Sequence, residues 1–240
     1  MQSTLYIALS AQLALQDRLD TIAQNVANGT TAGYRASEVK FDSVLSNSGG
    51  APVTFVSSGS QTIRRATGEL VKTGNPLDVA VKGDGWLSVA SPQGQTYTRD
   101  GRMQMNAAGS LVTLSGAPVL DAGGAPIQLD PFGGAPQIAQ DGTISQGDRR
   151  AGVLGLFNLP SNATLSRAEG GVTSSVPGIP VSDFTANGTV QGFVEQSNVN
   201  PISEISRLVY VQRAFESVSA VVQSAEASFK NAIQTLGSSS

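Results

Sequence analysis

The chain has 240 residues, a formal net charge of −3 and neither cysteine nor histidine. Without those residue types it cannot form disulfides, thiolate or imidazole metal sites, or a Ser-His-Asp triad. Its 15 basic and 18 acidic residues do not supply the basic field that nucleic-acid binding requires. Hydrophobic residues make up 40%, enough for a packed core, but only 14% are charged, against roughly 25% in a typical domain. So little charge indicates extensive contact with other protein surfaces.

The first 28 residues contain neither glycine nor proline, which predicts a helix ending at Asn28-Gly29. Its only charged side chains are Asp17, Arg18 and Asp20. A solvated helix usually has a charged face, so this one is expected to contact protein on more than one side. Steps of three and four residues, broken only by Gln12, connect the apolar Met1, Leu5, Ala8, Leu15, Leu19, Ile22 and Val26.

The middle of the chain holds almost all of the glycines and prolines. Residues 35–72 are rich in Ser, Thr and Gly and predict an extended connector. Beyond them, turn signals at roughly 8–12-residue intervals predict a mainly antiparallel β domain over residues 73–197. The strand candidates are Val79–Val81, Trp86–Ala90, Gln95–Thr98, Arg102–Asn106 and Ser110–Leu114.

The C-terminal end predicts a second helix over residues 201–236. Asn200 is a good N-cap, Pro201 suits the first helical position, Glu204 favours the positive end of the dipole, and Gly237 provides a stop. The same three-and-four spacing connects nine apolar residues, Leu208, Val211, Phe215, Val218, Val222, Ala225, Phe229, Ala232 and Leu236.

Matching heptad patterns at both ends predict an α+β fold in which the N- and C-terminal helices pair as a coiled coil, with Leu19 near Val222 as a trial register. Periodicity alone would favour two ordinary amphipathic core helices, but the helix length, the low charge and the placement at both ends favour pairing for assembly. The expected parts are 1–34, 35–72, 73–197 and 198–240. The expected assembly residues are Leu5, Leu15, Leu19, Ile22, Val26, Leu208, Val211, Phe215, Val218, Val222, Phe229 and Leu236.

Carboxylates are the remaining catalytic option. Asp78 with Asp84, or Asp100 with Asp141, are candidates for the acid/base pair of a glycosidase-like hydrolase. Three of these four residues precede a glycine, as in ordinary hairpin turns, and that interpretation is favoured. A β-rich exported hydrolase remains the alternative from another functional class.

Several long runs resemble the flagellar rod and hook family of axial proteins. Residues 25–35 resemble the signature that closes its first helix, residues 73–86 the start of its β domain, and residues 97–102 and 106–113 the next segments. Residues 197–201, followed by 212–216, resemble the start of its last helix. Trp86 departs from the Phe that is common there, as Gly29 does from a larger residue. The residues that carry the resemblance are Asn28, Thr31, Gly33, Tyr34, Asn75, Pro76, Leu77, Asp78, Gly83, Asp84, Gly85, Asn198 and Asn200.

The resemblance implies a structural subunit, not an enzyme, that needs no cofactor or metal. Its partners would be itself, other rod proteins and the flagellar type III export apparatus, which exports such proteins without a cleaved signal peptide into the periplasmic rod of the basal body. The chain length favours the proximal-rod type, with the distal-rod type as the close alternative. No basic segment precedes Arg18, so a cleaved secretory signal is not expected. No stretch approaches the roughly 20 apolar residues of a membrane span, so insertion is not expected either.

Overall fold

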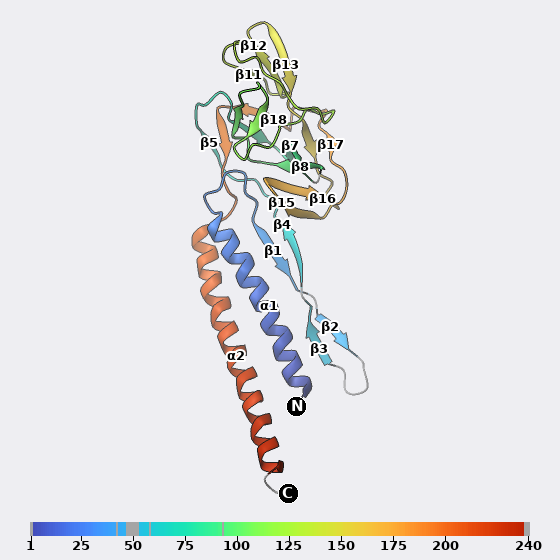
Figure 1. The fold of residues 1–240 in the computed structure, drawn as a ribbon, viewed down its shortest axis with the longest axis vertical. Helices are drawn as coiled ribbons and strands as arrows, with labels where there is room; N and C mark the ends of the chain where they lie inside the picture. Colours follow the sequence, from blue (N-terminus) through green and yellow to red (C-terminus); the bar gives the residue numbers. More distant parts are fainter. Residues whose placement is uncertain (1, 42, 47–52, 58, 93, 238–240) are drawn as a thin grey trace. The chain divides into compact units, whose positions relative to one another are not determined.

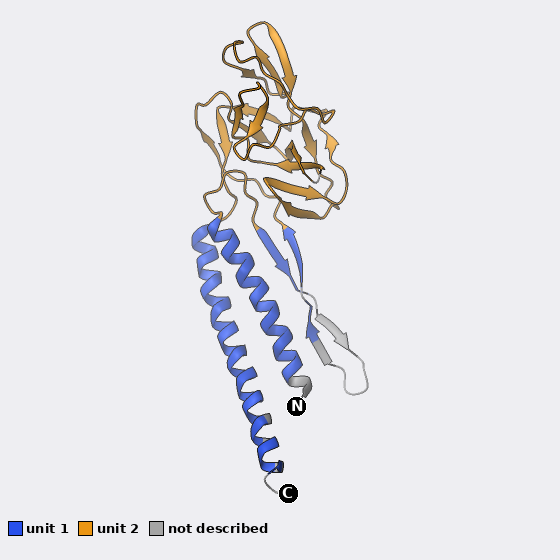
Figure 2. Cartoon of the chain, in the orientation of Figure 1, with its two compact units in different colours: residues 1–27, 37–62, 200–240 blue, residues 28–36, 63–199 orange. Residues whose placement is uncertain are grey.

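The computed structural model describes residues 2–41, 43–46, 53–57, 59–92 and 94–237. Its elements are shown in Figure 1 and its two compact units in Figure 2. Unit 1 consists of Met1–Ala27, Ser37–Thr62 and Asn200–Ser240, and unit 2 of Asn28–Ala36 and Ile63–Val199. Among the described residues, no helix combines the length and apolar character that a bilayer crossing needs.

Unit 1 is built on two long helices, α1 (Gln2–Ala27) and α2 (Pro201–Gly237), which pack side by side and run in opposite directions (Figure 1). The start of α2 follows the predicted cap: the Asn200 side-chain oxygen accepts a hydrogen bond from the Ser203 amide at 3.1 Å. Both helices therefore begin and end within one or two residues of the predicted bounds.

Unit 1 also contains paired strands within the stretch predicted as an extended connector. β1 (Ser37–Lys40) pairs with β4 (Ser60–Ile63), whose last residue belongs to unit 2. β2 (Ser43–Ser46) and β3 (Val53–Val56) form an antiparallel pair. Contacts of β1 and β3 with α1 give this helix a second neighbour besides α2.

Unit 2 is a β structure centred on a six-stranded sheet of order β15-β16-β8-β7-β14-β17, with antiparallel pairings. Around it, β18 pairs with β6, β19 with β5, β9 with β10, and β11 with β12 and β13. The α+β class with a mainly antiparallel sheet is thus confirmed. The strands are β5 (Leu70–Lys72), β6 (Val79–Lys82), β7 (Gly85–Ser91), β8 (Gly94–Thr98), β9 (Met103–Met105), β10 (Leu111–Thr113), β11 (Gln137–Ile138), β12 (Thr143–Gln146), β13 (Arg149–Val153), β14 (Leu156–Asn158), β15 (Leu165–Ala168), β16 (Gly171–Ser174), β17 (Ile179–Pro180), β18 (Gly188–Gln191) and β19 (Phe193–Glu195).

Two apolar clusters form the core of unit 2. The larger gathers aliphatic side chains from β6, β7, β10 and β12, among them the fully buried Val79, Leu111 and Ile144. The smaller is aromatic: Tyr97 and Phe157 meet edge to face, with ring centroids 5.6 Å apart. Unit 2 therefore buries a contiguous apolar interior of its own.

Candidate functional site

The apolar positions predicted on α1 and α2, which we name the seam, are at least half-buried wherever the structure describes their side chains, and the two helices contact each other. Ile22 and Val211 are buried in it. The side chains of Phe229 and Leu236 lie outside those that the structure describes. The remaining predicted residues are half-buried: Leu5, Leu15, Leu19, Val26, Leu208, Phe215, Val218 and Val222.

Two hydrogen bonds across the helices fix the register of the seam. Gln12 Nε2 donates to Ser219 Oγ at 3.2 Å, and Asn25 Nδ2 lies 3.5 Å from Glu204 Oε2. In antiparallel helices each step forward on one corresponds to a step back on the other, which places Leu19 level with Val211. The trial register of Leu19 with Val222 is therefore wrong by 11 residues. Steps of three and four residues repeat along each helix, so several shifts bring one apolar position level with another, and the pattern alone does not choose among them.

Asn25 is the centre of a buried polar network in unit 1. Its Nδ2 donates to the Ser37 carbonyl at 2.9 Å, and its Oδ1 accepts from the Ser37 amide at 2.9 Å. Glu204 beside it is buried and accepts from Arg207 NH1 at 2.6 Å. The network joins α1, β1 and α2, a role that the sequence analysis did not assign to Asn25. Its buried amide between apolar seam residues is the type of polar contact that can specify register.

Large apolar side chains remain exposed on the same two helices. On α1 they are Tyr6, Leu9 and Leu13, which directly follow Leu5, Ala8 and Gln12. On α2 they are Ile202, Ile205, Val209 and Tyr210 near its start and Val221 and Ile233 further along, with Ile202 79% exposed. Contiguous exposed apolar residues usually indicate contact with another protein. Residues 1–16 carry no charged side chain that would have to be desolvated in such a contact.

In unit 2, the loop after α1 packs closely against backbone atoms of other segments, and at Gly33 this packing leaves no space for a side chain. Gly33 has φ +68°, and a Cβ there would lie 2.1 Å from the Asp100 amide nitrogen. Its own amide donates to the Glu195 carbonyl at 2.7 Å. Asn28 and Thr31 join earlier in the loop through a 3.2 Å side-chain hydrogen bond.

Asn198 ties the same loop to the chain that leads into α2. Its amide donates to the Tyr34 carbonyl at 3.2 Å, and its Oδ1 accepts from the Ala36 amide at 2.7 Å. Its Nδ2 donates to the Ala66 carbonyl at 2.7 Å. One asparagine therefore joins three segments of unit 2.

Beneath this loop lies a buried ionic cluster, which the sequence analysis did not identify. Glu195 is paired with Arg35 at 2.7 Å and with Arg99 at 3.0 Å, and all three side chains are buried. Both guanidinium groups lie over the ring of Trp86, 5.7 and 5.5 Å from its centroid. Burial lowers the pKa of Arg35, and lowers that of Arg99 to about 10, with Glu195 opposing the shift in each case. The cluster is therefore a costly arrangement that depends on its single carboxylate.

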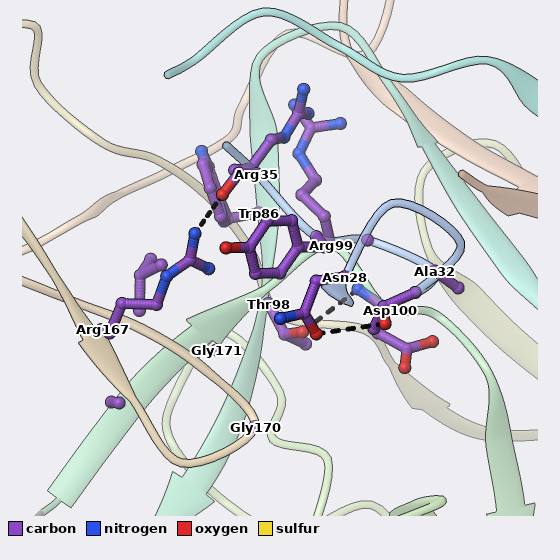
Figure 3. A pocket seen from close by; sticks show the side chains of 15 residues that line it. Asn28, Ala32, Arg35, Trp86, Thr98, Arg99, Asp100, Arg167, Gly170 and Gly171 are labelled. Carbon is purple, nitrogen blue, oxygen red and sulfur yellow. Dashed lines mark hydrogen bonds between the residues drawn. The ribbon is translucent and has the colours of Figure 1, made fainter. Parts of the chain in front are cut away.

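An open cavity of about 340 Å³ lies beside the loop and the cluster (Figure 3). Arg167 lines it, stacks over Tyr34 at 4.0 Å and donates a hydrogen bond to the Arg35 carbonyl. Desolvation lowers the pKa of Arg167. The cavity wall is thus held by the stacking of Arg167 on Tyr34 and by its hydrogen bond to the Arg35 carbonyl. Asp100 is the one carboxylate among its described lining residues, so the lining does not contain the two carboxylates of a glycosidase-like site.

The remaining family-motif residues of unit 2 make turns. Asn75 caps a turn through the Leu77 amide at 3.2 Å and bonds to Asp78 at 3.0 Å. The Pro76 carbonyl accepts from Gln191 at 2.8 Å, and Leu77 packs against the larger core cluster. In the turn between β6 and β7, Gly83 has φ +79° and Gly85 is buried. The Asp84 amide donates a hydrogen bond to Asn187 Oδ1.

The candidate catalytic carboxylates have turn and pairing roles. Asp100 is paired with Arg102 at 2.7 Å, and Asp141 accepts from the Thr143 amide and hydroxyl at 2.9 Å each. Those hydrogen bonds lower the pKa of Asp141. Among the described residues, no group of three or more acidic side chains is placed to hold a metal ion. These contacts match the turn interpretation.

In comparisons with known proteins, three protein-family models match separate parts of the chain. Residues 5–35 match the model described as flagella basal body rod protein, residues 80–146 the flagellar hook protein FlgE/F/G D1 domain, and residues 190–235 the flagellar basal body rod FlgEFG protein C-terminal. Together they cover most of both helices and residues 80–146 and 190–199 of unit 2.

Full-length relatives carry the same names. The chain is 48% identical to the flagellar basal-body rod protein FlgF of Mesorhizobium japonicum and 45% identical to that of Rhizobium meliloti, each over 100% of both chains. The flagellar basal-body rod protein FlgG of Agrobacterium fabrum is 32% identical, over 92% of this chain and 95% of the relative. The similarity to FlgF is therefore the stronger of the two.

Proposed function

Since the chain belongs to the FlgF family of flagellar basal-body rod proteins and is a structural subunit of that rod, we propose that it polymerises through its two terminal helices. The single observation that carries the proposal is the exposed apolar surface of α1 and α2, next to a seam that is only half-buried. In a polymer, neighbouring subunits would cover that surface.

The seam residues would have two roles in this assembly. Within one chain they pair α1 with α2 as a coiled coil, and the neighbouring stripes that begin at Tyr6 and Ile202 contact other subunits. Each subunit then offers different surfaces to its neighbours. Heterologous contacts of this kind extend into a filament instead of closing into a dimer.

Each part of the chain would have a different structural role. Residues 1–34 and 198–240 form the helical core of the polymer, residues 35–72 connect, and residues 73–197 form the β domain. The polymer is the proximal rod in the periplasm, the partners are copies of this chain and other rod proteins, and the flagellar type III export apparatus delivers the chain without cleavage. The subunit is a structural protein and not an enzyme, and it needs no cofactor.

Two crosslinking pairs test the helix pairing, because the chain has no cysteine of its own. The pair Leu19→Cys with Val211→Cys is expected to form a disulfide within one chain, since the two positions are level in the register. The pair Leu19→Cys with Val222→Cys is the matched control and should not react. Reaction of the control alone, or of neither pair in assembled rods, would contradict the proposed pairing.

Deletion of the gene separates the structural role from the hydrolase alternative. Loss of swimming and of basal-body rods is expected, and Asp78→Asn with Asp84→Asn in the restored chain should leave both intact. Swimming by the deletion strain, with a hydrolytic activity that those two substitutions abolish, would favour the alternative.

A further inference from the structure

Unit 2 presents one aromatic side chain almost completely to solvent. Phe132 is 96% exposed, at the tip of residues 130–134, which we name the Phe132 loop. Next among the exposed large apolar residues of unit 2 is Ile179, at 61%. Single exposed apolar residues are common on protein surfaces, so the exposure has meaning only if the loop is built to hold the ring outward.

The Phe132 loop is held by a buried glutamine. Gln146 Oε1 accepts from the Asp130 amide at 2.8 Å, and Gln146 Nε2 donates to the carbonyls of Asp130 at 2.9 Å and Gly134 at 3.1 Å. Asp130 Oδ1 in turn accepts from the Phe132 amide at 2.9 Å. The loop is therefore ordered before any contact forms, which lowers the entropy cost of binding through Phe132.

Glycine allows the loop to close over that glutamine. A Cβ on Gly133 would lie 3.1 Å from the Asp130 side chain and 3.2 Å from that of Gln146. Pro131 before it restricts the backbone further. A buried amide, a proline and a tightly packed glycine thus hold the backbone of the Phe132 loop in place.

A second part of unit 2 contains a cavity of suitable size and chemistry. It has a volume of about 310 Å³ and lies between the end of β7 and the turn after β10. Its walls are formed by the apolar Ala90, Pro92, Ala117 and Pro118, by Gly116, by the polar Ser91 and Ser115 and by the charged Glu169. The cavity is open to solvent, and its volume exceeds the roughly 150 Å³ of an enclosed apolar cavity that binds benzene, so a phenyl ring can enter it from outside.

We propose that Phe132 of one copy of this chain inserts into the cavity formed by Pro92, Ala117 and Pro118 of a second copy. The Phe132 loop and the cavity have no residue in common, so the contact is heterologous and can repeat from copy to copy without closing. This is a contact of unit 2, beyond the helical contacts of the proposed function.

The small size of the contact means that it would form only between copies that other contacts already hold together. A phenylalanine buries roughly 150–250 Å², far below the roughly 800 Å² per partner of a stable interface. Dilute chains would therefore not associate through Phe132 alone. Once the helices hold copies side by side, the effective concentration makes the contact favourable. In this respect the inference rests on the proposed function.

The test replaces Phe132 with the photoreactive p-benzoylphenylalanine in the full chain, expressed in a strain that lacks the native copy. Basal bodies are isolated and irradiated, and the adducts are mapped by mass spectrometry. We expect an adduct between two copies of the chain, at Pro92, Ala117 or Pro118. The matched control carries the same group at Ile179, which is exposed and apolar, and should give no adduct at those residues.

An adduct elsewhere on the chain, or on a different protein, would overturn the proposal. Rods that form normally without any adduct would overturn it as well, while leaving polymerisation through the helices intact. Failure of the Leu19→Cys, Val211→Cys pair to crosslink in assembled rods would instead count against the proposed function.

A second measurement covers the case in which the photoreactive chain does not assemble. Phe132→Ala removes the ring, and Ala117→Arg fills the cavity. Each should lower the amount of chain in basal bodies, and the double variant should be no worse than the more severe single variant, because both remove the same contact. Ala186→Arg, on an exposed loop of unit 2, is the control for added charge. Additive losses would overturn the proposal.

Discussion

Units 1 and 2 differ in where their apolar side chains are placed. Unit 2 packs aliphatic residues such as Val79, Leu111 and Ile144 completely out of solvent. Among the described side chains of α1 and α2, the buried apolar residues are Ala14, Ile22 and Val211, while the rest of the seam is half-buried. The hydrophobic effect scales with the area removed from water. Unit 2 therefore has an apolar interior of its own, whereas the helices of unit 1 bury few apolar side chains within the chain and would gain further burial in the proposed assembly.

The largest expected effect is a loss of stability of unit 2 when its buried ionic cluster is broken. Glu195→Gln leaves the buried guanidinium groups of Arg35 and Arg99 without their carboxylate. Removing one partner from a buried ion pair costs about 3–5 kcal/mol of the free energy of unfolding. Chemical denaturation of the full chain, followed by Trp86 fluorescence, measures the loss. Glu169→Gln at an exposed position is the control, and equal effects of the two variants would contradict a central role for the ionic cluster.

A substitution in the seam should prevent rod assembly without lowering the stability of unit 2. Phe215→Asp places a carboxylate on a half-buried apolar position of α2, and we expect a loss of about 2–3 kcal/mol of helix pairing. Rods and swimming should be lost, while the Trp86 unfolding transition of unit 2 is unchanged. Glu216→Asp, at the exposed neighbouring position, controls for position on the helix. A swimming Phe215→Asp strain would show that this position does not belong to the assembly surface.

Limited trypsin digestion of the dilute chain compares the two units directly. Isolated helices are marginal in water, so cleavage at Arg18, Arg207, Arg213 and Lys230 should be at least about tenfold faster than cleavage within unit 2. Arg35 is buried in unit 2 and should be protected. Mass spectrometry of the surviving fragment gives the boundaries. Protection of all four helical sites would mean that α1 and α2 are stable before assembly.

The smallest expected effect concerns a turn of unit 2. Hydrogen bonds from Thr143 lower the pKa of Asp141, so its contribution is present above the carboxyl's unfolded pKa and is lost as the pH falls through the folded value. Because the side chain is exposed, Asp141→Asn should cost only about 0.5 kcal/mol at neutral pH. The difference from the unmodified chain should shrink in acid. If the difference in the free energy of unfolding stayed constant from neutral pH to acid, the effect would come from the altered side-chain geometry and not from the carboxylate charge.

The sequence predicted the local features that single residues encode. Asn200 and Pro201 define the start of α2, and the turn at Gly83 separates β6 from β7 as expected. Contacts between distant segments were not predictable in this way. Nothing near Arg35 in the sequence indicates Glu195, 160 positions away, and the helix register depends on the polar Gln12 and Asn25 contacts instead of the repeating apolar positions.

The hydrogen bond from the Asn198 amide to the Tyr34 carbonyl has a topological consequence. It brings the two ends of the intervening segment within 3.2 Å of each other. The segment between these ends holds the β structure of unit 2 and also β1 to β4, of which β1 and β3 contact α1 in unit 1. A short turn joining residue 34 to residue 198 would therefore remove the strands that lie against α1 together with the β structure. A chain that keeps residues 37–62 and replaces only residues 64–197 retains the Asn25 contacts with Ser37, so this shorter replacement is the one compatible with the helices.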